Sequence, residues 1–189
     1  VGRFTRDKVI EDLVNAFLRL EKENPNLHLL LVGRLEADDR PSPEIIERME
    51  SHPRIHLTGP LSDVAPAYHA MDFLVLPSYR EGFPNVVLEA SAAGLATIGY
   101  RSTGVRDAVV DGETGELVDT GDVGGLAQAI ARYAADPDLC ERHGQAAFER
   151  VERSFAQEKV FEAVADFYRE ALAAHPDTAH LLAGLEPSE

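Results

Sequence analysis

Short apolar runs along the chain alternate with longer segments whose apolar residues recur at helical spacing. Near the start, Leu13, Phe17 and Leu20 fall on one face of a predicted helix. Short runs of apolar residues bounded by Pro, Gly or Asn predict strands. The predicted helices cover about 9–20, 43–50, 62–70, 84–93, 122–135, 138–152 and 157–173, and the predicted strands cover about 27–33, 54–58, 73–76, 96–99 and 116–118.

The alternation of strands and helices indicates one fold class. Short strands that are apolar throughout are typical of a parallel sheet covered by helices on both faces. We therefore predict an α/β, doubly wound parallel sheet of Rossmann-like type over residues 1–174, followed by a C-terminal tail at 175–189. Ligands of such sheets bind outside the carboxyl ends of the strands. The segments that follow predicted strand ends are Arg3, Arg34, Pro60, 78–82 and 100–104.

The composition narrows the function classes. The 189 residues carry a net charge of −15, which disfavours binding to nucleic acid or to an anionic membrane. The single cysteine, Cys140, excludes a disulfide framework and a thiolate metal cluster. No apolar run approaches the roughly 18 residues of a membrane span and no signal peptide is visible, so we expect a cytoplasmic protein without a transmembrane segment. Residues 1–4 have the pattern of a strand end and its loop, and we interpret the chain as part of a longer protein.

The stretch from Ser78 to Gly94 carries the most chemical information. It contains a carboxylate on a turn, Glu81, and a second carboxylate, Glu89, inside an otherwise apolar helical run that begins at Pro84. A charge in such surroundings needs a partner, and the vicinal hydroxyls of a ligand would supply one. The free N–H groups of the first helical turn and the helix dipole favour hydroxyls or phosphate oxygens at the same place.

Several other kinds of site are excluded or disfavoured. The dinucleotide fingerprint and the P-loop motif are both absent. The seven histidines show no ligand spacing, and Asp38 and Asp39 lie in a polar loop, so we predict no metal site. Ser78 lacks the flanking glycines of a hydrolase nucleophile.

Four segments, in order and with sensible gaps, carry a resemblance to a known family. The first combines Gly2, Arg3 and Phe4 with Lys8, and the second has two glutamates with seven residues between them. Together the segments resemble the C-terminal, donor-binding domain of a GT-B fold, family 4 (group 1) retaining glycosyltransferase. The four segments are 2–8, 76–90, 93–109 and 111–118.

The resemblance implies retaining transfer of a sugar from a nucleoside-diphosphate sugar, with no cofactor and no required metal. Arg3 and Lys8 would neutralise the donor diphosphate, and Glu81 would contact the transferred sugar; these are the implied catalytic residues. Glu89 would accept hydrogen bonds from the ribose hydroxyls. The other implied substrate-binding residues are Gly2, Gly59, Leu61, Gly82, Phe83, Pro84, Asn85 and Val86.

Structural explanations stay open for the same residues. Arg3 and Lys8 could be surface charges, Glu81 a solvated turn residue and Glu89 the partner of a core arginine; Phe83 is either a core residue or a platform for the sugar. Two other functions also stay open: a sugar-nucleotide epimerase of GT-B architecture, and a non-catalytic nucleotide-binding module. The sequence departs from the family at Val9, because a glycine often follows the lysine there.

The resemblance also implies that the chain holds only half of an active site. An N-terminal domain that carries the acceptor pocket is absent from the chain, so its implied partners are a nucleotide-sugar donor and that domain. The chain alone is expected to be inactive. The apolar stripe of Val160, Val164, Phe167 and Ala171 is expected to face the absent domain in part. Similar sequences point to the synthesis of bacterial polysaccharide or glycoconjugate, in the cytoplasm or peripherally at the membrane through the absent domain.

Overall fold

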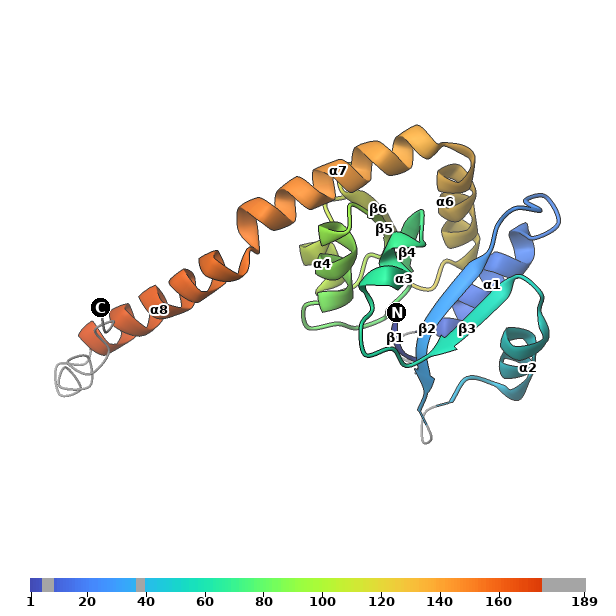
Figure 1. Ribbon diagram of the computed structural model, residues 1–189, viewed down its shortest axis with the longest axis horizontal. Coiled ribbons are helices and arrows are strands. Elements are labelled where there is room, and N and C mark those ends of the chain that lie inside the picture. Colours follow the sequence, from blue (N-terminus) through green and yellow to red (C-terminus); the bar gives the residue numbers. More distant parts are fainter. Residues whose placement is uncertain (5–8, 37–39, 175–189) are drawn as a thin grey trace. The chain divides into compact units, whose positions relative to one another are not determined.

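Helices and strands alternate along the chain in a computed structural model that describes residues 1–4, 9–36 and 40–174 (Figure 1). The chain divides into two compact units, residues 1–149 and 150–189, which are described separately. The strands are β1 Gly2–Phe4, β2 Leu29–Leu35, β3 Ile55–Gly59, β4 Phe73–Leu76, β5 Ala96–Tyr100 and β6 Gly115–Val118. The helices are α1 Ile10–Leu20, α2 Pro43–Ser51, α3 Ala65–His69, α4 Asn85–Ala92, α5 Val105–Ala108, α6 Val123–Ala135, α7 Pro137–Ser154 and α8 Gln157–Ala173.

The described strands form two three-stranded sheets in which every pairing is parallel. The first sheet has the order β1-β2-β3 and the second the order β4-β5-β6. A doubly wound sheet has the order 3-2-1-4-5-6, so the two sheets are its two halves, and the predicted fold class is confirmed. One difference from the prediction is that β1 and β4 are not paired. The reason is the length of β1, which pairs only with Gly33, Arg34 and Leu35 of β2.

Two buried apolar clusters cover opposite faces of the second sheet. Phe73 and Val75 of β4 pack against the cluster that contains α1 and α6. Leu74 and Leu76 belong instead to the cluster that contains α3, α4 and α5. Alternate residues of a strand point to opposite faces, so β4 is covered on both sides, as its unbroken apolar run predicts.

The ends of α4 matter because they bound the candidate site. Pro84 has extended backbone (φ −80°, ψ 102°) and precedes the first helical residue, so the helix begins at Asn85, one residue later than predicted. Gly94 follows the helix with φ 77°, a conformation that glycine adopts without strain, and this confirms its predicted role in ending the helix.

The second unit contains α8, whose bounds agree with the predicted helix. Val160, Val164 and Phe167 are exposed along it, and Ala171 is half-buried. That the stripe faces a further domain stays a prediction, as does the division of the chain at residue 174; the predicted tail lies outside the described residues. None of the described helices combines the length and the apolar character that crossing a membrane requires.

Candidate functional site

The loop between β4 and α4, which carries Glu81, rests on the loop between β5 and α5. The buried Ser102 hydroxyl donates a hydrogen bond of 2.7 Å to the carbonyl oxygen of Ser78, which is also buried. The backbone N–H of Glu81 donates to the carbonyl oxygen of Thr103 at 3.3 Å. These two hydrogen bonds involve only backbone groups and one buried hydroxyl. They therefore fix the path of the backbone that carries the half-buried Glu81.

Gly104 makes the approach of the two loops possible. Its φ is 80°, and a Cβ at this position would lie 2.4 Å from the carbonyl oxygen of Gly82 and 2.5 Å from that of Glu81. No other residue type fits such a close approach between two backbones. The sequence resemblance included Gly104 only as part of a matching loop, and its contact with the Glu81–Gly82 peptide is a new finding.

Glu89 lies on α4 in surroundings that differ from the prediction. The helix buries Val87, Ala90 and Ser91, and Glu89 is on the exposed side. The argument that its charge is desolvated among apolar neighbours is therefore wrong, because the short helix turns that position away from the core. Among the described residues its partner is not a core arginine either: its Oε2 accepts a hydrogen bond of 2.8 Å from the hydroxyl of Tyr68.

Tyr68 is a residue that sequence reasoning missed. It lies on α3, is 2 % exposed, and donates its hydroxyl to the carboxylate of Glu89. Burial, together with the hydrogen bond to Glu89 and its charge, raises the pKa of the Tyr68 phenol far above its ordinary value, so the hydroxyl is a permanent donor. The only sequence signal was a tyrosine on the apolar side of a short helix, which does not indicate a partner.

Replacing Tyr68 by phenylalanine is expected to lower the free energy of unfolding by about 1–2 kcal/mol, because the hydrogen bond from its hydroxyl to a carboxylate is lost. Tyr79→Phe is the matched control. It also removes a hydroxyl that donates to a carboxylate, but Tyr79 is 46 % exposed and its bond to Asp12 is longer, at 3.3 Å. Urea unfolding of both variants measures the difference, and equal losses would contradict the role given to Tyr68.

The start of α1 is connected to the same loop through Asp12. The hydroxyl of Tyr100, at the end of β5, donates to Asp12 Oδ2 at 2.8 Å, and that of Tyr79 donates to the same oxygen at 3.3 Å. The two tyrosine rings are stacked, with centroids 5.9 Å apart. Burial and then Asp12 raise the pKa of Tyr100. These contacts bring the first turn of α1, which follows the Arg3–Lys8 segment along the chain, beside the β4–α4 loop.

A strained residue, Val9, follows the Arg3–Lys8 segment along the chain. Arg3 is exposed on β1, and Lys8 lies outside the described residues. Val9 has φ 42° and ψ 49° at the N-cap of α1, and it is the one non-glycine residue with positive φ among those described. A β-branched residue pays on the order of 1–2 kcal/mol in this conformation. Valine in place of the family's glycine therefore leaves the backbone strained at this position, and burial of the Val9 side chain offsets the cost.

The remaining predicted residues are placed as follows. Phe83 is 40 % exposed, which contradicts the alternative that it is a core residue. Asn85 is exposed, Val86 half-buried and Pro84 buried at the start of α4. The hydrogen bonds described above connect α4 to α3. They also connect the β4–α4 loop to the β5–α5 loop and to α1. Gly59 (φ 71°) and Leu61 (41 % exposed) lie at the end of β3, and their predicted contact with the nucleobase stays a prediction.

Residues 1–136 match the family described as "Glycosyl transferases group 1", which is more than half of the chain. The chain belongs to this family. The expected resemblance to a group 1, GT-B glycosyltransferase is therefore confirmed.

Known proteins and solved structures are similar over most of the chain. The capsular polysaccharide biosynthesis glycosyltransferase CapM of Staphylococcus aureus is 33 % identical over 168 residues, which are 89 % of this chain and 44 % of CapM. The structure of sucrose-phosphate synthase from Thermosynechococcus elongatus has 35 % identity and a TM-score of 0.79 over 92 % of this chain and 45 % of that one. The C-terminal domain of LpcC from Francisella tularensis shares the fold, with a TM-score of 0.74 at 22 % identity over 83 % of this chain and 84 % of that one. The chain therefore spans less than half the length of CapM and of the synthase.

Asp111, in the last of the family's segments, anchors the loop that supports Glu81. Its Oδ2 accepts from Arg101, just after β5, at 2.6 Å, and its Oδ1 accepts from the backbone N–H of Leu117 at 2.9 Å. Burial raises the pKa of the Asp111 carboxyl, but the hydrogen bonds from Arg101 and Leu117 outweigh it and hold the pKa below its ordinary value. The ionised form is thus the one that the fold stabilises.

This stabilisation is expected to be present at pH values above the ordinary carboxyl pKa and to be lost as the pH falls through the lower pKa of the folded state. Asp111→Asn should therefore reduce the free energy of unfolding at pH 7 by about 1 kcal/mol or less, since both side chains are more than a third exposed. The difference between the proteins should shrink below about pH 4. Chemical unfolding at several pH values measures it, and a constant difference would contradict the assignment.

Within the described residues, no three His, Cys, Asp or Glu side chains lie together as a metal site would need. Asp38 and Asp39 fall outside those residues. The independence from metal that the resemblance implies stays a prediction.

Proposed function

We propose that the chain is the donor-binding domain of a glycosyltransferase that takes a sugar from a nucleoside diphosphate and transfers it with retained anomeric configuration. The observation that supports this best is the way in which backbone and side-chain contacts position the two carboxylates. Glu81 sits on a loop fixed by Gly104, and Glu89 is held by Tyr68 on the following helix. The names of the similar proteins, a capsular polysaccharide glycosyltransferase and a sucrose-phosphate synthase, support a sugar-transfer reaction and the synthesis of polysaccharide or glycoconjugate.

In this proposal the charges of the chain stabilise the departing diphosphate without a metal or other cofactor. Arg3, Lys8 and the N-terminus of α4 would surround the phosphates, and such fixed charges and dipoles act where charge develops in the transition state. The backbone N–H groups of Gly82 and of the residues that begin α4 would hold sugar hydroxyls or phosphate oxygens. An overall charge of −15 disfavours anion binding, so any site for the diphosphate has to be built locally from a few cationic side chains and backbone N–H groups.

Glu81 and Glu89 would contact opposite ends of the donor. Glu89 would accept hydrogen bonds from the two ribose hydroxyls, and its exposure on α4 leaves it accessible to them. Glu81 would lie at the transferred sugar, where positive charge develops as the bond to the diphosphate breaks. The acceptor would bind to a further domain of the same enzyme.

Calorimetric titration with UDP, GDP and ADP, followed by sugar derivatives of the nucleotide that binds, tests the proposal. We expect one nucleotide to bind, and Arg3→Ala to weaken it about tenfold or more through loss of a charged contact to phosphate. Arg19→Ala, which removes an exposed positive charge at the other end of α1, is the control and should have no effect. Failure of the full-length protein to bind any nucleoside diphosphate would contradict the proposal.

The 189-residue chain alone is expected to bind nucleotide weakly and to transfer no sugar, because it would supply only half of the active site. A radiolabelled-donor assay on the purified chain measures this, and turnover would contradict the assignment of acceptor binding to a further domain. Product analysis with the full-length enzyme separates sugar transfer from epimerisation, since an epimerase forms product without an acceptor.

A further inference from the structure

The carboxylate of Asp12 connects three segments near the carboxyl ends of the strands. Asp12 lies in the first turn of α1, and its Oδ2 accepts from the hydroxyls of Tyr100 at 2.8 Å and of Tyr79 at 3.3 Å. Tyr100 is the last residue of β5, and Tyr79 precedes Glu81 by two residues in the β4–α4 loop. A single oxygen thus connects α1 to the segments that lead into both loops of the candidate site.

Both tyrosines are themselves held in place. Their rings are stacked, 13° from parallel with centroids 5.9 Å apart. Tyr100 is buried, and a Cβ on Gly121, in the loop before α6, would lie 3.6 Å from the Tyr79 hydroxyl. Burial and then the charge of Asp12 raise the pKa of the Tyr79 phenol, so the phenol stays protonated and donates. Asp12 is therefore bound by donors whose positions the fold fixes.

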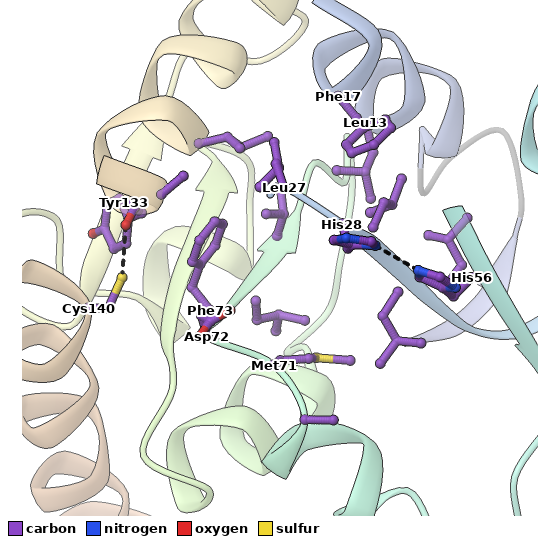
Figure 2. A pocket seen from close by; sticks show the side chains of 18 of the residues that line it. Leu13, Phe17, Leu27, His28, His56, Met71, Asp72, Phe73, Tyr133 and Cys140 are labelled. Atoms are coloured by element: carbon purple, nitrogen blue, oxygen red, sulfur yellow. Dashed lines mark hydrogen bonds between the residues drawn. The ribbon is translucent and has the colours of Figure 1, made fainter. Parts of the chain in front are cut away.

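The apolar contacts of α1 do not fix its first turn in the same way. Leu13 and Phe17 line a cavity with a volume of about 800 Å³ beside strands β2 and β4 (Figure 2). Apolar contacts are non-directional, whereas hydrogen bonds to an ionised group are short and directional. The position of this turn relative to the β4–α4 loop therefore depends mainly on Asp12.

We propose that Asp12 is a positioning residue, which acts through the two tyrosine hydroxyls to hold Glu81 at a fixed distance from the residues that neutralise the diphosphate. This inference rests on the proposed function, in which Arg3 and Lys8 bind the phosphates and Glu81 contacts the transferred sugar. Charge develops at both places as the bond to the diphosphate breaks. A displacement of about 1 Å between such groups can lower a rate about 100-fold.

The charge of Asp12 and its positioning role predict different effects. A carboxylate in the first turn of α1 repels a diphosphate bound at the start of that helix, so its removal by charge alone would favour binding of the donor. The positioning role predicts instead a lower kcat while the KM of the donor stays nearly the same. A general loss of structure would impair both quantities.

Kinetics of the full-length enzyme test the inference, with Asp12→Ala compared with Glu44→Ala. Glu44 is the matched control, because it is an exposed acidic residue in the first turn of another helix, α2. Release of diphosphate to water is measured with UDP-glucose, ADP-glucose and GDP-mannose. We expect Asp12→Ala to lower kcat about tenfold or more and to change KM less than about threefold, and Glu44→Ala to change neither.

Tyr79→Phe is the second variant, because Tyr79 is exposed and its replacement should leave the chain folded. It should lower kcat several-fold on its own and have no further effect when combined with Asp12→Ala, because both changes remove the same contact.

Hydrogen exchange tests the contact without any nucleotide. In the 189-residue chain, Asp12→Ala should speed exchange about threefold or more in peptides that cover residues 78–83, and Glu44→Ala should not. Asp12 and Tyr79 are 67 residues apart along the chain, so a local effect on α1 does not account for this result.

Unchanged exchange in residues 78–83 would overturn the inference, as would a rise in KM with kcat unchanged. Additive effects of Asp12→Ala and Tyr79→Phe would overturn it too. Failure of the unsubstituted enzyme to bind or hydrolyse any sugar nucleotide would instead contradict the proposed function, and the exchange measurement would still decide whether Asp12 holds the loop.

Discussion

Replacing Gly104 by alanine is expected to lower the free energy of unfolding by about 3 kcal/mol and to abolish nucleotide binding. The positive φ alone costs about 1 kcal/mol for alanine. The added methyl group would meet the carbonyl oxygens of Gly82 and Glu81 at 2.4 and 2.5 Å, and overpacking of this kind adds about 1–3 kcal/mol. These oxygens belong to the backbone and cannot rotate away, so the loop that carries Glu81 has to move.

Gly112→Ala separates strain from displacement of the loop. Gly112 has φ 75°, similar to Gly104, but a Cβ there would meet nothing within 4 Å. It should therefore lose only the strain energy of about 1 kcal/mol and keep its affinity for nucleotide. Urea unfolding and calorimetric titration of both variants give the comparison. If the two lose the same stability and the same affinity, the contact between the loops does not position the site.

Glu89→Ala is expected to weaken nucleotide binding about 100-fold and to lower the free energy of unfolding by about 1–2 kcal/mol. A hydrogen bond to a charged group contributes about 1.5–3 kcal/mol, and the variant would lack the carboxylate that we propose binds both ribose hydroxyls. The loss of stability follows from the buried Tyr68 hydroxyl, which loses its acceptor, and Tyr68→Phe should show a loss of similar size. Titration of the two proteins with the same nucleotide measures the loss.

A 2′-deoxynucleotide makes this test specific for the ribose. The unsubstituted chain should bind it about tenfold more weakly than the ribonucleotide, whereas Glu89→Ala should bind the two alike, because its carboxylate is already gone. Glu47→Ala, at another exposed helical glutamate, should behave like the unsubstituted chain. Undiminished discrimination by Glu89→Ala would rule out its contact with the ribose.

The local elements followed from the sequence because their causes are local. The bounds of β4 come from an apolar run ended by Pro77, and those of α8 from helical periodicity. The partners of the candidate site residues did not follow, because the contacts join distant positions: 21 residues separate Tyr68 from Glu89, and 88 separate Asp12 from Tyr100. Periodicity indicates that a helix has an apolar side. On a helix as short as α4 it does not show that Glu89 lies on the exposed side.

The sequence indicated that residues 1–4 are the end of a strand, but it did not predict that β1 and β4 are unpaired. The strands and their order agree with a doubly wound fold, but pairing of β1 with β4 requires strands of sufficient length on both sides. The strained backbone of Val9 was missed for a related reason: a valine in an apolar pattern predicts burial, which is found, but not its φ of 42°.

The aromatic and aliphatic side chains exposed on α8 affect how copies of the isolated chain interact in solution. Phe161, Phe167 and Tyr168 are each more than half exposed, and exposed apolar surface of this kind favours association of the isolated chain. The net charge of −15 opposes such association, but only over the Debye length, which shrinks to about 8 Å at physiological ionic strength. Two forces of different range therefore act between copies of the isolated chain, and the salt concentration decides which of them prevails.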